Sequence, residues 1–342
     1  MKQAFTFDDV ALVPQFNNVP SRTEPKLGTW LTKNVKMSIP ILASNMDSVI
    51  SEELAEVLIE EGSVPIFHRF TSLEKQKKWI KKFKGKVFIS TGLQKFEEMA
   101  KLLALEPLGV CIDVAHGHSD RMIHLIEKIK KNFPNIEIIA GNACTAMAYH
   151  DLVNAGADAV KVGIGPGAVC TTRVVTGFGV PQFSAIQDCA RVADKLRVPL
   201  IADGGIRSSR DVVLALAAGA SSVMIGKLFA LTKESAAKKR RVVKSKGKKG
   251  KSCYEYEAKY RGQASQDFQN DYYGGLKAKT VAEGIDLWGQ VSGPASDLID
   301  ELLGGLRSGL TYGGARNIKE LQRKAEFVQV THAYMPESFP RL

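Results

Sequence analysis

The chain has 342 residues, of which 44% are hydrophobic and 24% are charged, so it can bury a full core, and disorder is excluded as its main state. Its formal net charge of +11 raises the question of a nucleic-acid partner. The sequence has no leader peptide and no apolar run of about eighteen residues, which predicts a cytoplasmic protein without a membrane partner. Its five cysteines are irregularly spaced, which indicates reduced thiols and neither a disulfide framework nor a zinc knuckle.

Apolar, β-branched segments recur along the chain at even spacing, and most are followed by a stretch with helical periodicity. The eight predicted strands are 36–44, 63–67, 86–91, 108–114, 136–141, 158–164, 199–205 and 221–226. The predicted helices between them include 51–62, 73–83, 119–133, 185–196 and 209–220. This alternation predicts an α/β fold, a (β/α)8 TIM barrel over 1–342 as one catalytic domain, with a doubly wound sheet as the competing architecture.

The loops after the strands carry the chemistry in such barrels, because the carboxyl ends of parallel strands meet at one face. One of these loops, GPGAVCTTR at 165–173, places Cys170 after a Gly- and Pro-rich turn and before two hydroxyls and Arg173. This setting can stabilise a thiolate, so a nucleophilic Cys170 is favoured over a buried one. Cys111 and Cys189 stand in apolar segments and are predicted to be core residues.

The loops after the seventh and eighth predicted strands, ADGG and IGK, suit a nucleotide. Backbone N–H groups can approach a phosphate closely at Gly204, Gly205 and Gly226. Lys227 adds a positive charge, and Asp203 can accept hydrogen bonds from ribose hydroxyls. The alternative is that both segments are only tight turns between a strand and a helix.

Two later segments lie beyond the eighth predicted strand. The block KKRRVVKSKGKKGK at 238–251 contains nine Lys or Arg residues and no acid, so it holds most of the excess charge. Because it has no aromatic platform, it is interpreted as a solvated basic loop, and a nucleotide- or RNA-binding protein that uses it is the alternative of another class. The double-glycine segment 272–284 has the composition of a mobile flap, in which Glu283 becomes functional if the flap folds over Cys170.

These segments resemble the IMP dehydrogenase and GMP reductase family over nearly the whole chain. The matching motifs are TFDDVALVP (6–14), SNMDSV (44–49), IDVAHGHS (112–119), AGNACT (140–145), KVGIGPGAVCTTR (161–173), GVPQFSAI (179–186), IADGGI (201–206), VMIG (223–226) and GGLRSGLTYGGA (304–315). The resemblance implies a barrel that interconverts purine nucleotides, with GMP and IMP as its ligands.

Within the family, two features favour the reduction of GMP over the oxidation of IMP. The strands run on without room for the inserted regulatory domains that the dehydrogenases usually carry. The segment 260–284 is similar to the short reductase flap, whereas the dehydrogenases have a longer flap with an Arg-Tyr pair that activates water, and this chain has Asp271 before Tyr272. The expected activity is NADPH-dependent reductive deamination of GMP to IMP, with an IMP dehydrogenase lacking regulatory domains as the alternative.

The resemblance also implies a covalent mechanism. The Cys170 thiolate would add to C2 of the purine of GMP, ammonia would leave to give a thioimidate, and hydride from NADPH would then release IMP. In the family, a threonine two residues after the cysteine and a flap glutamate handle the proton for the departing ammonia. These positions are Thr172 and Glu283, so the implied catalytic residues are Cys170, Thr172 and Glu283.

The implied ligand contacts fall into three sets. The nucleotide would contact Ala168, Asp203, Gly204, Gly205, Gly226, Lys227, Gly262, Gln263, Ala264, Thr280 and Gly284. The NADPH cofactor would contact Arg69, Asp113, Val114, Ala115, Ile164, Gly165, Ser308, Gly309, Leu310 and Thr311, and Ser21 and Arg22 would meet the cofactor of a neighbouring subunit in a homotetramer. A monovalent cation, K+, would lie at Gly165, Gly167, Cys170 and Arg173.

Some positions depart from the family pattern. Ala168 stands where the family usually has serine, and Lys227 is expected to compensate for the missing hydroxyl. Gln263 and Ala264 replace the usual Met and Ser, and Thr280 replaces an arginine of one reductase branch. The sequence therefore leaves open whether the nucleotide is plain GMP or a variant of it.

Overall fold

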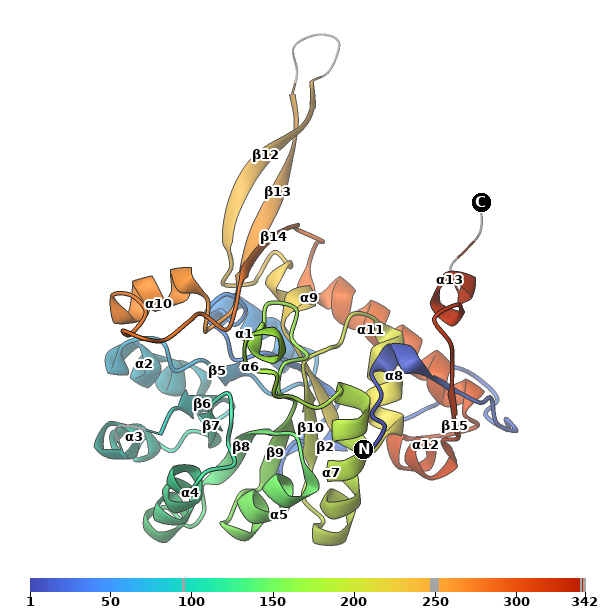
Figure 1. Cartoon of the computed structure of the whole chain (residues 1–342), viewed down its shortest axis with the longest axis horizontal. Coiled ribbons are helices and arrows are strands. Elements are labelled where there is room, and N and C mark those ends of the chain that lie inside the picture. The colour runs from blue at the N-terminus through green and yellow to red at the C-terminus, as the bar shows by residue number, and fades with distance from the viewer. Residues whose placement is uncertain (94–95, 247–251, 339, 341–342) are drawn as a thin grey trace.

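A central sheet of eight parallel strands organises the chain (Figure 1). The computed structural model describes residues 1–93, 96–246, 252–338 and 340. The sheet order is β4-β11-β10-β9-β8-β7-β6-β5, so β4, the first of these strands along the chain, pairs with β11, the last, as in a barrel. The predicted (β/α)8 barrel is confirmed, and the doubly wound sheet is excluded because the strand order contains no switch point. The strands are β4 (Ile41–Ala43), β5 (Ile66–Phe67), β6 (Phe88–Thr91), β7 (Gly109–Asp113), β8 (Glu137–Ala143), β9 (Ala159–Val162), β10 (Leu200–Asp203) and β11 (Ser222–Ile225).

Two apolar layers hold the barrel together. Parallel strands are covered on both faces, so their residues are apolar almost throughout. Each strand contributes one fully buried residue to a cluster inside the barrel: Leu42, Ile66, Phe88, Cys111, Ile139, Ala159, Ile201 and Met224. The alternate residues pack outward against the helices, and that layer includes Cys189, so both cysteines predicted to be core residues are buried.

Helices that follow the strands form the outer layer. They are amphipathic, with an apolar stripe toward the sheet, which is how a helix buries one face and leaves the other in water. The helices are α1 (Glu52–Glu60), α2 (Leu73–Phe83), α3 (Phe96–Leu103), α4 (Asp120–Asn132), α5 (Ala146–Asn154), α7 (Gln182–Leu196), α8 (Ser209–Ala217) and α11 (Ala295–Tyr312).

The first predicted strand, 36–44, is wrong as a single element. Lys36–Met37 forms β3, which pairs antiparallel with β2 (Thr29–Trp30), and only Ile41–Ala43 enters the barrel. Pro40 separates the two pieces and has no N–H to donate to a ladder. Met37 joins the cluster inside the barrel, so this hairpin contributes to the barrel interior.

The prediction of a basic loop over 238–251 is also wrong for the described part of that segment. Lys238–Lys246 forms β12, which pairs antiparallel with β13 (Ser252–Arg261), and β13 pairs with β14 (Asp286–Gln290). In Figure 1 the β12–β13 hairpin stands out from the barrel as an arm. Residues 247–251 of the predicted loop lie outside the described residues.

Partners on the neighbouring strand explain why so basic a segment forms a strand. The Nε of Arg240 donates to Glu257 at 2.8 Å, and Lys244 pairs with Glu255. The Arg241 guanidinium carbon lies 3.3 Å from the centre of the Tyr254 ring. Cross-strand ion pairs and cation–π contacts offset the repulsion that isolated cations would feel.

Shorter elements complete the described chain. They are a 3₁₀ turn (Phe7–Asp9), β1 (Val10–Leu12), α6 (Thr172–Thr176), α9 (Lys227–Ala230), α10 (Gln266–Tyr273), α12 (Ile318–Lys324), β15 (Phe327–Gln329) and α13 (Tyr334–Ser338). β15 pairs antiparallel with β1, which joins a segment near the start of the chain to one near its end. Among the described helices, none has the length and apolar character needed to cross a bilayer.

A hydrogen bond from α5 to the segment before β10 gives a test of the barrel packing. The hydroxyl of the buried Tyr149 donates to the carbonyl oxygens of Val198 at 2.8 Å and Pro199 at 3.1 Å. Tyr149→Phe leaves both carbonyls without this donor, so we expect the free energy of unfolding in a urea titration to fall by about 1–2 kcal/mol. Met147→Ala, at an exposed site on the same helix, is the control and is expected to change it by less than about 0.5 kcal/mol. Equal unfolding curves for Tyr149→Phe and the parent protein would contradict the role of this bond.

Candidate active site

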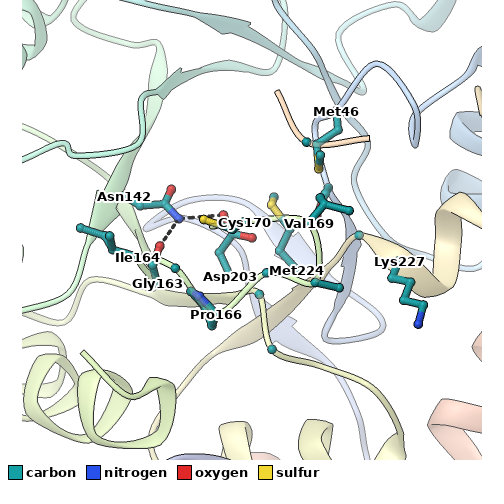
Figure 2. A pocket seen from close by; sticks show the side chains of 18 of the residues that line it. Met46, Asn142, Gly163, Ile164, Pro166, Val169, Cys170, Asp203, Met224 and Lys227 are labelled. Atoms are coloured by element: carbon teal, nitrogen blue, oxygen red, sulfur yellow. Dashed lines mark hydrogen bonds between the residues drawn. The ribbon is translucent and has the colours of Figure 1, made fainter. Parts of the chain in front are cut away.

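A cleft of about 610 Å³ opens at the carboxyl ends of the barrel strands. The loops after most of the eight strands line it, together with residues 6–8, 260, 262–264 and 283–284. Figure 2 shows Cys170, Asn142 and Asp203 among the side chains of this pocket. The cleft therefore lies on the face where barrels of this type carry their chemistry.

Cys170 lies on the loop between β9 and α6, and it lines the cleft. Its Sγ donates to Oγ1 of Thr172 over 3.3 Å. A half-buried thiol beside a hydroxyl is accessible to a ligand and has a group nearby that can exchange a proton with it. The arrangement suits a nucleophile that forms a covalent intermediate.

The flap returns to the cysteine loop through its backbone. The N–H of Thr171 donates to the carbonyl of Glu283 at 2.9 Å, and the N–H of Ile285 donates to the carbonyl of Val169 at 3.0 Å. These bonds on either side of Cys170 bring Glu283 into the lining of the same cleft. The segment that carries Glu283 therefore folds back onto the cysteine loop, and the catalytic role of this glutamate stays a prediction.

Arg173 shapes the cysteine loop from within. Its Nε donates to the carbonyl of Ile164 at 3.0 Å, and its Nη2 donates to that of Val180 at 2.5 Å. Gly165 has a φ of +85°, and a side chain there would collide with the stem of Arg173. The guanidinium thus holds the turn that presents Cys170 to the cleft.

The residues expected to hold a monovalent cation all belong to this loop and line the cleft: Gly165, Gly167, Cys170 and Arg173. Within the described parts of the chain, no group of three or more His, Cys, Asp or Glu side chains is arranged to hold a metal ion. A cation at this loop would therefore depend on backbone carbonyl oxygens, which suit K+. The site stays a prediction, and no step below uses it.

A buried ion cluster lies at the base of the cleft. The ammonium of Lys161, whose side chain is 2% exposed, donates to Oδ1 of Asp113 at 2.7 Å and to Oδ2 of Asp203 at 3.0 Å. Nδ2 of Asn142 donates to the same oxygen of Asp203 at 3.0 Å. Burial alone disfavours the ammonium, but the two carboxylates outweigh it, so the pKa of Lys161 lies well above its ordinary value. The cluster fixes two carboxylates that both line the cleft.

The part of the cleft next to Asp203 has an exposed backbone. Gly204 and Gly205 have φ values of +92° and +82°, and a side chain at Gly226 would collide with the hydroxyl of Tyr260. Lys227 begins α9, and Figure 2 shows its ammonium pointing away from Cys170. The other residues of the predicted nucleotide set that line the cleft are Ala168, Asp203, Gly262, Gln263, Ala264 and Gly284.

The part next to Asp113 contains an arginine with an unused donor. The Nε of Arg69 is buried and has no hydrogen-bond partner among the described residues, and the guanidinium carbon lies 4.1 Å from the centre of the Phe70 ring. A buried donor without an acceptor is costly, so Arg69 fits as a contact for an oxygen of a ligand such as a nicotinamide cofactor. The other predicted cofactor residues in the cleft are Asp113, Val114, Ala115, Ile164 and Gly165.

Seven predicted contacts lie outside the cleft. Thr280 is exposed, and its hydroxyl donates to the carbonyl of Lys277. Ser21 and Arg22 are also exposed, on the surface of the chain. Ser308 and Gly309, which precede Leu310 and Thr311 on α11, line a second cavity of about 450 Å³ beside β1 and α8. Contacts of these residues with a cofactor across a subunit boundary stay a prediction.

The residues that line the cleft but were not among the predicted site residues include Lys161, Asn142 and Tyr260. Lys161 had a usable signal, because a lysine inside an otherwise apolar predicted strand is rarely buried without a charged partner. Tyr260 had none, since it stands at the end of an arm that was not foreseen. Its hydroxyl donates to the sulfur of Met46 at 3.5 Å, and burial raises the pKa of Tyr260.

Known proteins are similar to this chain over nearly its whole length. A model of the IMP dehydrogenase / GMP reductase domain matches residues 4–341. The chain is 38% identical to the inosine-5'-monophosphate dehydrogenase of Borreliella burgdorferi over 398 aligned positions, which cover 99% of this chain and 97% of that protein. It is 36% identical to the enzyme of the same name from Cryptosporidium parvum, over 98% of this chain and 94% of that protein. It is 37% identical to the GMP reductase of Vibrio atlanticus over 336 positions, which cover 95% of this chain and 94% of that protein.

Lys227 gives a test of the end of the cleft that is expected to bind the nucleotide phosphate. If its ammonium reaches a bound phosphate, Lys227→Ala raises the KM for the nucleotide about tenfold and changes kcat less than about twofold, because one charge-assisted hydrogen bond is lost from ground and transition states alike. Lys233→Ala, an exposed lysine just after α9, is the control and leaves both constants unchanged. Steady-state kinetics at varied nucleotide concentration measure the effect, and an unchanged KM in Lys227→Ala would refute the contact.

Proposed function

The chain belongs to the IMP dehydrogenase / GMP reductase family, and we propose that within it the chain is a reductase that converts GMP to IMP and ammonia with NADPH. Membership makes it an oxidoreductase of purine metabolism that acts on IMP or GMP with a nicotinamide cofactor. The direction of the reaction and the choice of NADPH are the proposal.

The proposal depends on the set of groups around the cysteine. Cys170, Thr172 and Glu283 line one cleft, with the sulfur 3.3 Å from the threonine hydroxyl. This set can deliver a proton to a departing amine, which reductive deamination needs.

The flap supports the same direction. Tyr272 follows Asp271 and not the arginine of a water-activating pair. Asp271 pairs with Arg261 at 2.5 Å, and Arg261 also donates to Asp47, so this arginine is committed to two carboxylates. Neither Arg261 nor Tyr272 lines the cleft. The length of the chain also favours the reductase. The alignment to the Borreliella dehydrogenase needs 398 positions, more than the 342 residues of this chain, whereas the alignment to the Vibrio reductase needs 336.

The first half of the reaction removes ammonia. Asp203 would accept hydrogen bonds from the ribose hydroxyls of GMP, and the glycine turns beside it would face the phosphate. The sulfur of Cys170 would give up its proton and bond to C2 of the purine. The bond from C2 to the exocyclic nitrogen would break as that nitrogen accepts a proton by way of Thr172 and Glu283, and ammonia would leave.

The second half restores the cysteine. NADPH supplies the two electrons of the reaction as a hydride to C2. Arg69 and the residues from Asp113 to Ala115 would hold and orient the cofactor, with the free Nε of Arg69 meeting one of its oxygens. The bond between sulfur and C2 would then break, which returns Cys170 to the thiolate and frees IMP. Division of a difficult displacement into two steps is the usual gain of covalent catalysis.

The family resemblance extends the proposal to the assembly. A homotetramer would bring Ser21 and Arg22 of one subunit to the cofactor of its neighbour, which accounts for the distance of these residues from the cleft of their own chain. Leu310 is buried, and Thr311 beside it is half-buried, so those two residues would act by shaping α11 more than by direct contact. K+ at the cysteine loop belongs to the same proposal.

Oxidation of IMP with NAD is the second candidate. The observation in its favour is that the Borreliella and Cryptosporidium relatives, which match nearly the whole chain, bear the name of the dehydrogenase. Nucleic-acid binding through the arm has less support, because Arg240 and Lys244 are paired with Glu257 and Glu255.

An assay of nicotinamide absorbance in the near ultraviolet decides between the two directions. We expect purified protein to consume NADPH when GMP is added, and we expect Cys170→Ala to lower the rate by a factor of about 10³ or more, because the covalent route is lost. Cys144→Ala is the matched control, since Cys144 is half-buried and does not line the cleft. Formation of NADH from IMP and NAD, with no oxidation of NADPH by GMP, would overturn the proposed direction in favour of the dehydrogenase.

A further inference from the structure

Lys161 has no step in the reaction proposed above, although its ammonium is buried at the base of the cleft. We propose that Lys161 is a positioning residue shared by the two ligand subsites, which orients Asp113 for the cofactor and Asp203 for the nucleotide. The inference rests on the proposed assignment of these carboxylates to the two ligands. It does not depend on whether the reaction runs as reduction or oxidation.

The strand register makes this sharing possible. Asp113 on β7 stands opposite Gly141 on β8, and Gly141 stands opposite Lys161 on β9. A Cβ at Gly141 would lie 2.7 Å from the Cβ of Lys161, so the glycine leaves a path for the lysine stem across β8. Asp203 ends β10, the strand on the other side of β9. One ammonium therefore bridges carboxylates from strands that are not neighbours.

The ammonium of Lys161 offsets part of the negative charge of the two carboxylates. The titratable groups that face it are Asp113 and Cys111 from β7, Asp203 from β10 and Tyr260 from β13. Burial raises the pKa of Cys111 to about 12 and also raises that of Tyr260, so both stay neutral near pH 7. One ammonium thus serves two carboxylates. Lys161 takes one oxygen of each, which leaves the second oxygen of each to accept a ligand hydroxyl.

Removal of the Lys161 ammonium is expected to make ligand affinity depend on pH. Two carboxylates in a buried site repel each other, so without Lys161 the pair keeps a proton to a higher pH. A protonated carboxyl group is a poorer acceptor for ribose hydroxyls. Ligand affinity in the variant would then be low near neutral pH and rise as the pH rises and the pair loses that proton. In the parent protein, where the ammonium bridges the two carboxylates, no such rise is expected.

The test is calorimetric titration of the full chain in a Cys170→Ala background, which prevents turnover. GMP and IMP are each titrated at several pH values between about pH 6 and pH 9. NADPH is titrated against protein saturated with nucleotide. Lys161→Met is expected to weaken both nucleotides and NADPH by about tenfold or more at neutral pH, which is the size of one lost charge-assisted interaction. The nucleotide affinity of this variant should climb toward the parent value as the pH rises.

A second substitution separates positioning from mere structural support. Adding Asp113→Asn to Lys161→Met leaves a single carboxylate, so Asp203 ionises again, and the affinity for GMP and IMP at neutral pH should recover while that for NADPH does not. Lys130→Met is the matched control, because Lys130 pairs with Asp158 at 2.6 Å just before β9, away from the cleft. It removes a lysine ion pair of the same barrel region and should leave all three affinities unchanged.

Two results would overturn the inference. One is an equal loss of nucleotide affinity at every pH with no recovery in the double variant, which would make Lys161 a structural residue only. The other is an unchanged affinity in Lys161→Met. If that variant does not fold, Gly141→Ala carries the test, since it keeps all three charged groups but closes the path of the lysine. It should weaken both nucleotide and NADPH, and parent affinities would overturn the inference. Because IMP is titrated beside GMP, these outcomes are independent of the direction of the reaction.

Discussion

Parallel pairing of the eight barrel strands is the constraint on which the rest of this structure depends. It brings the carboxyl ends of the strands to one rim, so polar loops far apart in the sequence surround a single cleft. The same register places Asp113, Gly141 and Lys161 in one row across three strands. The ion cluster is therefore a product of the strand pairing. It places charged groups at the base of the cleft, and the loops after the strands form the walls.

Residues that follow the last barrel strand complete the lining of the cleft. The segment after β13 returns to the cysteine loop through backbone hydrogen bonds to residues on both sides of Cys170. Tyr260 at the end of β13 reaches over Gly226, where a side chain would leave no room for its hydroxyl. Glu283 thus lines the same cleft as the Cys170 thiol because these backbone bonds hold a distant part of the chain in place. The position of the flap segment and that of the cysteine loop are therefore fixed by the same backbone hydrogen bonds.

The barrel and most of the cleft could be predicted from the sequence because both depend on local patterns. Apolar, β-branched segments indicated the strands, and the glycine-rich loops after them indicated the rim of the barrel. Three failures have physical causes. The strand 36–44 is interrupted at Pro40. The basic arm becomes a strand because of partners such as Glu257 and Tyr254 on the facing strand, which no local pattern of 238–251 contains. The role of Lys161 depends on a gap at Gly141 that only the register reveals.

In the proposed reaction, Cys170 bonds to C2 of a guanine nucleotide and ammonia leaves. The decisive measurement is mass spectrometry of the peptide that contains Cys170, after acid quenching of protein incubated with GMP and no cofactor. We expect a peptide heavier by GMP less ammonia, with the mass on Cys170 and free ammonia in the supernatant. A modification on another cysteine, or an adduct that forms only from IMP with NAD and never from GMP, would contradict it.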